Sequence, residues 1–244
     1  MPDITFKAAE EILAEKSLHP EPAKFHIPEW FKKIPKIIKV KDYEGLSIKA
    51  CLPFQDTLVA GYILKNPIDQ EFNFLVNNDV FVNTKTGGEE DVVSKLHVNV
   101  NYGDEKHHTG QLGGEHGGCP FVKMNSDQDF YKIMNPFSIT LPKGYSALLT
   151  PLLNRPDPRF TPISAIIDDG NPLPPNFPII IHKKGTWLLK KGEPIIGLIP
   201  FKREKWKMKI KTKTKKETSN YLFSYKSVLQ RWYRDKFWKK KQWE

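Results

Sequence analysis

The chain has 244 residues, of which 39% are hydrophobic and 27% charged, and its formal net charge is +10. This length allows one large domain with a buried core, and no apolar stretch approaches the roughly 20 residues that a transmembrane helix needs. Twenty prolines against fifteen glycines favour turns over long helices, and only two cysteines, Cys51 and Cys119, favour a reducing compartment. We therefore expect a loop-rich, mostly β protein that is soluble, cytoplasmic and not secreted.

The positive charge is concentrated at the C-terminal end. Residues 202–244 contain sixteen Lys or Arg against four Asp or Glu, a net of +12, which leaves −2 for residues 1–201. Charge and hydropathy together predict three parts: a helix and proline-rich arm at 1–44, a β domain at 45–201 and a basic, aromatic tail at 202–244.

The N-terminal region is predicted to begin with a short amphipathic helix. Within Thr5–Lys16, apolar residues recur at helical spacing at Phe6, Ala9, Ile12 and Leu13. Four prolines between 20 and 35 exclude a continuous helix beyond it. This stretch is interpreted as an extended arm anchored by Trp30 and Phe31.

Short apolar runs separated by Gly, Asn, Asp or Pro predict two series of strands, as in a sandwich or barrel. The first series is Leu46–Pro53, Leu58–Leu64, Phe72–Val76, Val80–Asn83 and His97–Asn101. The second series is Phe137–Leu141, Tyr145–Leu149, Ser164–Ile167, Phe177–Ile181, Trp187–Lys190 and Pro194–Pro200.

Between the two series lies a polar, glycine-rich stretch, residues 102–119, which is predicted to be a long loop. It holds five candidate metal ligands, with His97 upstream: His107, His108, Glu115, His116 and Cys119. Imidazole, carboxylate and thiolate groups are ligands for zinc or iron, so the cofactor that this loop would hold is a divalent metal ion. Their spacing matches no standard motif, and a solvated loop is the alternative.

The tail opens with an alternating pattern. From Lys205 to Lys215 lysines alternate with Trp206, Met208, Ile210 and two threonines, which predicts a strand with all its lysines on one face. After Thr218 and Ser219 as candidate caps, aromatic residues at helical spacing predict a C-terminal amphipathic helix.

Basic and aromatic side chains together can neutralise phosphates and stack on bases, as in nucleic-acid binding. Alternating lysines also protect an edge strand from aggregation, and an aromatic stripe can pack on protein, so both alternatives stay open. The candidate residues for binding a nucleic acid or an acidic protein are Lys205, Trp206, Lys207, Lys209, Lys211, Arg231, Trp232 and Trp238.

Part of the chain is similar to the motif series of trimeric dUTPases and dCTP deaminases. The segments that carry the resemblance are Ala60–Tyr62, Ile139–Leu149, Ile166–Asp169 and Lys190–Ile199. The resemblance implies a β-clip fold and a trimer, and it places Asp168 and Asp169 as candidate catalytic or cation-binding carboxylates. It places Asn154 and Arg155 in a loop that could bind an anion.

The chain also departs from those families at several positions. Ile63 stands where dUTPases carry an aspartate, Leu152–Arg155 replaces their Ser-containing phosphate loop, and their glycine-rich C-terminal clamp is absent. Each departure removes a phosphate or metal contact that hydrolysis would need. Asp168-Asp169-Gly170 is also a favourable turn sequence.

Over its whole length the chain resembles a family of unassigned function from tailed bacteriophages and some bacteria. The segments that carry this resemblance are Ile27–Lys33, Asn135–Phe137, Leu141–Ser146, Leu153–Arg155, Asn176–Pro178 and Ile199–Trp206. It implies a viral setting, in the bacterial host cell or the virion.

The leading hypothesis is therefore a phage-type, non-catalytic β-clip-like protein whose tail docks on a partner subunit or nucleic acid. The alternative is a diverged nucleotide hydrolase or deaminase that uses Asp168 or Asp169, or a metal enzyme that uses the histidine loop.

Overall fold

A computed structural model describes residues 2–74, 80–85, 130–170, 173–182, 185–220 and 233–244. The chain divides into two compact units, the first formed by residues 1–21 and 61–202 and the second by residues 22–60 and 203–244. The three parts inferred from composition, 1–44, 45–201 and 202–244, have other boundaries than these two units, and that division stays a prediction. None of the helices in the described ranges has the length and apolarity to cross a bilayer.

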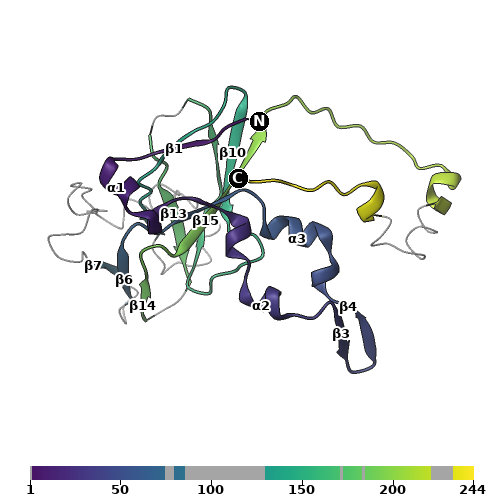
Figure 1. The fold of residues 1–244 in the computed structure, drawn as a ribbon, viewed down its shortest axis with the longest axis horizontal. Helices are drawn as coiled ribbons and strands as arrows, with labels where there is room; N and C mark the ends of the chain where they lie inside the picture. Colours follow the sequence, from purple (N-terminus) through teal and green to yellow (C-terminus); the bar gives the residue numbers. More distant parts are fainter. Residues whose placement is uncertain (1, 75–79, 86–129, 171–172, 183–184, 221–232) are drawn as a thin grey trace, which may run out of the picture. The chain divides into compact units, whose positions relative to one another are not determined.

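The first unit is mostly β, as predicted (Figure 1). Its strands are β1 (Thr5–Lys7), β2 (Glu21–Pro22), β5 (Tyr62–Lys65), β6 (Asp69–Phe74), β7 (Val80–Lys85), β8 (Phe130–Ile133), β9 (Ser138–Thr140), β10 (Tyr145–Pro151), β11 (Phe160–Pro162), β12 (Ala165–Asp168), β13 (Phe177–Ile181), β14 (Thr186–Leu189) and β15 (Pro194–Lys202). The largest sheet has the order β12-β10-β15-β5-β2, and two three-stranded sheets have the orders β11-β13-β8 and β14-β6-β7. The described strands form several separate sheets and no closed barrel.

The strands with continuous apolar sequence supply much of the core of this unit. Ile196 and Leu198 of β15 are fully buried and pack in one cluster with Ala147 and Leu149 of β10. Continuous apolar runs occur where a strand is covered on both faces, which explains why sequence analysis located β10, β13 and β15 correctly. The predicted strand at 97–101 and the loop at 102–119 lie outside the described residues.

A buried guanidinium cluster supports the ends of two strands. Arg159 donates to both Asp157 carboxylate oxygens, to Glu193 Oε2 at 2.6 Å and to the Leu188 carbonyl at 2.8 Å. The hydrogen bonds from Arg159 to Asp157, and then those to Glu193, raise the pKa of the guanidinium above its ordinary value despite its partial burial. This ion cluster therefore ties the loop before β11 to β14 and to the turn before β15.

The predicted N-terminal helix at Thr5–Lys16 is wrong in its first part. Phe6 lies in β1, opposite Ile139 of β9, and the helix α1 (Glu10–Ala14) begins only after this strand, followed by the 3₁₀ helix η1 (Lys16–Leu18). Pairing with a strand far along the chain overrides the local helical spacing. Within α1, Ile12 is buried as the spacing predicts.

The second unit begins with the 3₁₀ helix η2 (Ala23–His26) and α2 (Glu29–Lys33), followed by the hairpin β3 (Ile37–Val40) and β4 (Tyr43–Leu46). Next come η3 (Ile48–Ala50) and α3 (Leu52–Leu58), so the strand predicted at Leu46–Pro53 is wrong. Pro53 lies in the first turn of α3, where its missing N–H is not needed, and Ser47 Oγ accepts from the Lys49 N–H to cap η3. The predicted anchor Phe31 is buried and stacks on Phe54, at 5.7 Å between ring centroids.

The C-terminal part of this unit differs from the prediction. Residues 203–214 form no strand, so the strand predicted at Lys205–Lys215 is wrong for the single chain. The reason is that no neighbouring strand pairs with this segment among the described residues. Helical residues begin at Lys215 and not after Thr218 or Ser219. The aromatic stripe predicted for residues 221–232 lies outside the described ranges.

Candidate functional site

The carboxylates Asp168 and Asp169 stand where β12 ends. Ser146 Oγ of the neighbouring β10 donates to Asp168 Oδ1 at 2.5 Å, and the Gly144 N–H donates to Asp169 Oδ2 at 2.8 Å. Gly144 has a φ of +84°, in the left-handed region that glycine adopts most easily. Asp168 therefore links β12 to β10, and Asp169 links the end of β12 to the turn that precedes β10.

The predicted anion loop, Asn154 and Arg155, lies after β10. Asn154 has a φ of +57°, and the Arg155 N–H donates to the Leu152 carbonyl at 3.1 Å, which closes a tight turn. Arg155 is half-buried, and this burial lowers the pKa of its guanidinium. The geometry shows a turn in which an asparagine adopts a left-handed conformation.

The candidate metal ligands His107, His108, Glu115, His116 and Cys119 all lie outside the described residues. Among the residues that are described, no three His, Cys, Asp or Glu side chains gather as a metal site. The metal site in the loop at 102–119 stays a prediction.

The lysine-rich segment, residues 205–212, is the most exposed part of the described chain. It follows β15 as an extended segment without secondary structure (Figure 1). Trp206, Met208 and Ile210 have 87%, 85% and 88% of their surface exposed. Between residues 203 and 215 there are seven basic residues and one acidic residue, so the segment is also strongly positive.

A capping box ends this segment. Glu217 Oε2 accepts from the Thr214 N–H at 2.7 Å, while Thr214 Oγ1 accepts from the Glu217 N–H at 3.2 Å. The two reciprocal bonds start the helical turn at Lys215, which is why the extended conformation stops there. The hydrogen bonds from Thr214 also lower the pKa of Glu217.

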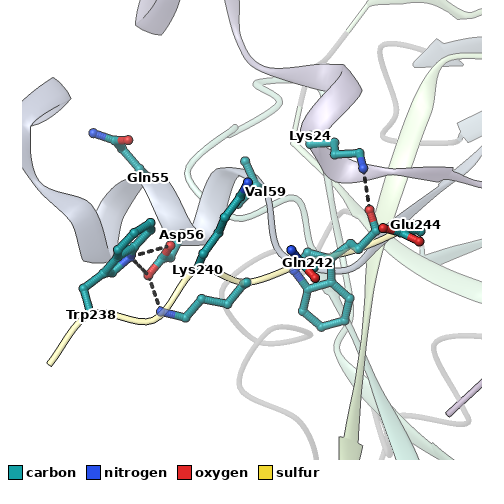
Figure 2. A pocket seen from close by; sticks show the side chains of 10 residues that line it. Lys24, Gln55, Asp56, Val59, Trp238, Lys240, Gln242 and Glu244 are labelled. Atoms are coloured by element: carbon teal, nitrogen blue, oxygen red, sulfur yellow. Dashed lines mark hydrogen bonds and ion pairs between the residues drawn. The ribbon is translucent and has the colours of Figure 1, made fainter. Parts of the chain in front are cut away.

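Trp238, another predicted partner-binding residue, lies in a different place from the lysine-rich segment. Its indole N–H donates to both carboxylate oxygens of Asp56 in α3, at 3.2 and 3.1 Å, and Lys241 Nζ lies 2.6 Å from Asp56 Oδ2. Lys24 Nζ donates to the Trp243 carbonyl at 2.6 Å. We call this set of contacts, drawn in Figure 2, the C-terminal clasp.

The clasp borders a cavity of about 380 Å³ within the second unit. Both tryptophans of the clasp, Lys240 and Gln55 line it (Figure 2). Sequence analysis missed Asp56 because nothing near it in the sequence distinguishes it: its partners Trp238 and Lys241 follow more than 180 residues later. Arg231 and Trp232, which were grouped with Trp238, lie outside the described residues.

No protein-family model matches the chain, and no curated protein is significantly similar to it in sequence. Its fold is partly similar to a mutant dUTPase of Staphylococcus bacteriophage 80alpha with dUpNHpp, at 17% identity and a TM-score of 0.27, over 36% of this chain and 69% of that one. A mutant dUTPase from phage phi11 of S. aureus is similar at 15% identity and a TM-score of 0.27, over 36% of this chain and 75% of that one. The likeness is partial and assigns no activity to this chain.

Proposed function

We propose that this chain is a non-catalytic, phage-type assembly protein, and that residues 205–211 are a docking strand that pairs with the sheet edge of a second copy. The observation that carries the proposal is the 85–88% exposure of Trp206, Met208 and Ile210 at alternate positions. The docking strand is defined here as Lys205–Lys211.

The backbone of the docking strand supports the same conclusion. Within Lys205–Lys211 no N–H or C=O group makes a hydrogen bond to another described residue. An extended segment of this kind has the shape of an edge strand, and pairing with an existing sheet satisfies its backbone groups in regular order.

The apolar side of the docking strand favours a protein partner over a nucleic acid. Burying one side chain the size of Ile, Met or Trp contributes about 1.5–3 kcal/mol relative to leaving it exposed. A polynucleotide would use the lysines and could stack on Trp206, but Met208 and Ile210 offer no flat surface to a base. A sheet edge covers all three apolar residues and leaves the lysines in solvent.

The contacts of Asp168 and Asp169 support the non-catalytic part of the proposal. Each carboxylate accepts a structural hydrogen bond: Asp168 accepts from Ser146 Oγ of the neighbouring strand β10, and Asp169 accepts from the Gly144 N–H in the turn before β10. The dUTPase-like and metal-enzyme alternatives have no comparable observation in their favour among the described residues.

The test compares two variants of the full chain by sedimentation velocity over a series of protein concentrations. One variant replaces Trp206, Met208 and Ile210 with Ser, and its matched control replaces Lys205, Lys207, Lys209 and Lys211 with Gln. We expect the native chain to self-associate, the apolar variant to be monomeric, and the lysine variant to keep most of its association.

A single-stranded oligonucleotide, titrated in low and high salt, distinguishes the competing function. A native chain that stays monomeric at every concentration, together with salt-dependent oligonucleotide binding that is lost in the lysine variant, would identify nucleic acid as the partner. That result would overturn the proposal.

A further inference from the structure

The proposed docking strand needs an acceptor edge, and the sheets of the first unit differ in what their edges offer. β12 (Ala165–Asp168) is the outer strand of the five-stranded sheet and has one strand neighbour, β10, among the described residues. Ile167 is half-buried and packs against the main core cluster, whereas Ala165 and Asp168 are exposed and Ile166 is 63% exposed. Such an edge can accept one more strand.

The charge of β12 complements the docking strand. Asp168 and Asp169 end the strand, and the sequence from Phe160 to His182 contains no Lys or Arg. Because side chains alternate along a strand, Asp168 points to the same side as Ile166 and opposite to Ile167.

The alternation of lysines and apolar residues in the docking strand therefore matches the two sides of β12. If the docking strand lies beside β12 with Trp206, Met208 and Ile210 on the side of Ile167, they extend the core cluster that Ile167 already touches. The lysines then fall on the side of Ile166 and Asp168, where they can pair with the carboxylate across the strands. A shift of the docking strand by one residue would place its lysines beside Ile167 and its apolar residues beside Asp168. The residues that supply the attraction therefore also specify the register.

Three other edges in the described chain suit a lysine-rich strand less well. The hairpin β3–β4 also exposes apolar residues, including Ile37 at 59%, but the three lysines of residues 36–46 outnumber the two carboxylates there, Asp42 and Glu44. β14 is flanked by lysines at both ends, and β2 is two residues long and contains Pro22. A strand with four lysines therefore gains less electrostatic attraction at the first two edges than at β12, and the third edge offers too few residues for pairing.

We infer that β12 of one copy receives the docking strand Lys205–Lys211 of a second copy, with the lysines facing Asp168 and the apolar residues continuing the core beside Ile167. This inference rests on the proposed function and names the surface that it needs. The interaction surface consists of two segments that the described part of the chain leaves exposed.

The experiment measures the dissociation constant of self-association for the full chain and for variants of the acceptor edge. Ile166→Arg puts a positive charge on an exposed position without emptying the core, and we expect it to raise the dissociation constant by at least about tenfold. Ile37→Arg, at a comparably exposed position of β3, is the matched control and should leave the constant unchanged.

Charge reversal gives a second, independent readout. Asp168→Lys should weaken association, and combining it with Glu at positions 205, 207, 209 and 211 should restore it, because the reversed charges again attract. Circular dichroism verifies that each variant is folded, since Asp168 also accepts from Ser146.

The outcomes separate the two proposals. If serine at Trp206, Met208 and Ile210 abolishes association while Ile166→Arg and the charge reversal have no effect, the docking strand stands and β12 is not its acceptor. If Ile37→Arg is the variant that dissociates the assembly, β3 is the acceptor and the inference is overturned. If no variant of the tail changes the association, the proposed function fails together with this inference.

Discussion

β15 and the docking strand follow one another directly in the chain, yet they have opposite environments. β15 (Pro194–Lys202) is paired on both sides, with β10 and β5, and Ile196 and Leu198 are fully buried. The docking strand, which begins three residues later, is extended but exposes Ile210 to 88%. Both segments have strand-forming sequences, and the difference is that only β15 has neighbouring strands among the described residues.

The two sequences also differ in pattern. β15 is almost continuously apolar, as is typical of a central strand that is covered on both faces. The docking strand alternates lysine with apolar residues, as is typical of a strand with one face exposed to solvent. An alternating strand without a sheet is incomplete, because its apolar side is uncovered. The comparison supports the proposal that the docking strand pairs with a second copy, because the described residues of its own chain do not cover its apolar side.

The largest expected effect comes from Gly61, which lies against β15. It has a φ of +69°, and a Cβ there would lie 2.0 Å from the Leu198 carbonyl oxygen. Gly61→Ala should therefore lower the free energy of unfolding by about 3 kcal/mol or more, measured by urea denaturation. Gly170→Ala is the control: its φ is +82° but the space around it is open, so about 1–2 kcal/mol is expected. Equal losses in the two variants would contradict the close contact.

A second pair of variants tests the comparison directly. Ile196→Ala in β15 leaves a cavity in the core and should lower the free energy of unfolding by about 2–5 kcal/mol. Ile210→Ala, in the docking strand, should change it by less than about 0.5 kcal/mol when measured at concentrations where the chain is monomeric. A comparable loss in Ile210→Ala would mean that the docking strand packs within its own chain.

The third prediction concerns the C-terminal clasp. Asp56→Ala removes the acceptor of Trp238 and the ion-pair partner of Lys241, two partly exposed interactions worth about 1–2 kcal/mol together. Amide hydrogen exchange in residues 238–244 should then accelerate about tenfold. Asp235→Asn, which affects only the neighbouring pair with Arg234, should leave that exchange unchanged. No acceleration in Asp56→Ala would show that the clasp does not hold the C-terminus.

The smallest expected effect depends on pH. The hydrogen bonds from Ser17 and then from Lys191 lower the pKa of Glu15 from 4.5 to about 2. Because the folded pKa is the lower one, Glu15 contributes stability above pH 4.5 and this contribution disappears as the pH falls toward 2. The partly solvated pair is worth less than about 1 kcal/mol.

Glu15→Gln tests this contribution in urea denaturation at several pH values. It should reduce stability near neutral pH and should approach the native chain near pH 2, while the exposed Glu11→Gln should have no effect at either pH. A constant difference between native and Glu15→Gln protein across this range would argue against the lowered pKa.

Much of the β structure could be predicted from the sequence, for a physical reason that also explains the errors. β10, β13 and β15 contain apolar runs that must be covered on both faces of a sheet. Neighbouring residues in the sequence are therefore enough to identify these strands. Phe6 has helical spacing with Ala9 but lies in β1, because Ile139 offers a strand partner that no local pattern records. Pro53 lies in the first turn of α3 and not in a strand, because the N–H that proline lacks is not required there.

The candidate site was predictable in composition but not in arrangement. The lysines and Trp206 were identified from alternation, while the expected strand pairing is absent among the described residues. Trp238 was grouped with them because it is aromatic and near lysines, yet it contacts Asp56 in α3. Asp168 and Asp169 were recognised from their motif, whereas their hydrogen bonds to β10 and its preceding turn required the fold.

The most direct measurement of the central claim is amide hydrogen exchange in residues 205–211 of the full chain at low and high protein concentration. Docking as an added strand predicts that these amides are protected at high concentration, exchange freely on dilution, and lose their protection when Trp206, Met208 and Ile210 are replaced with Ser. Exchange at the rate of an unstructured peptide at every concentration would contradict the account.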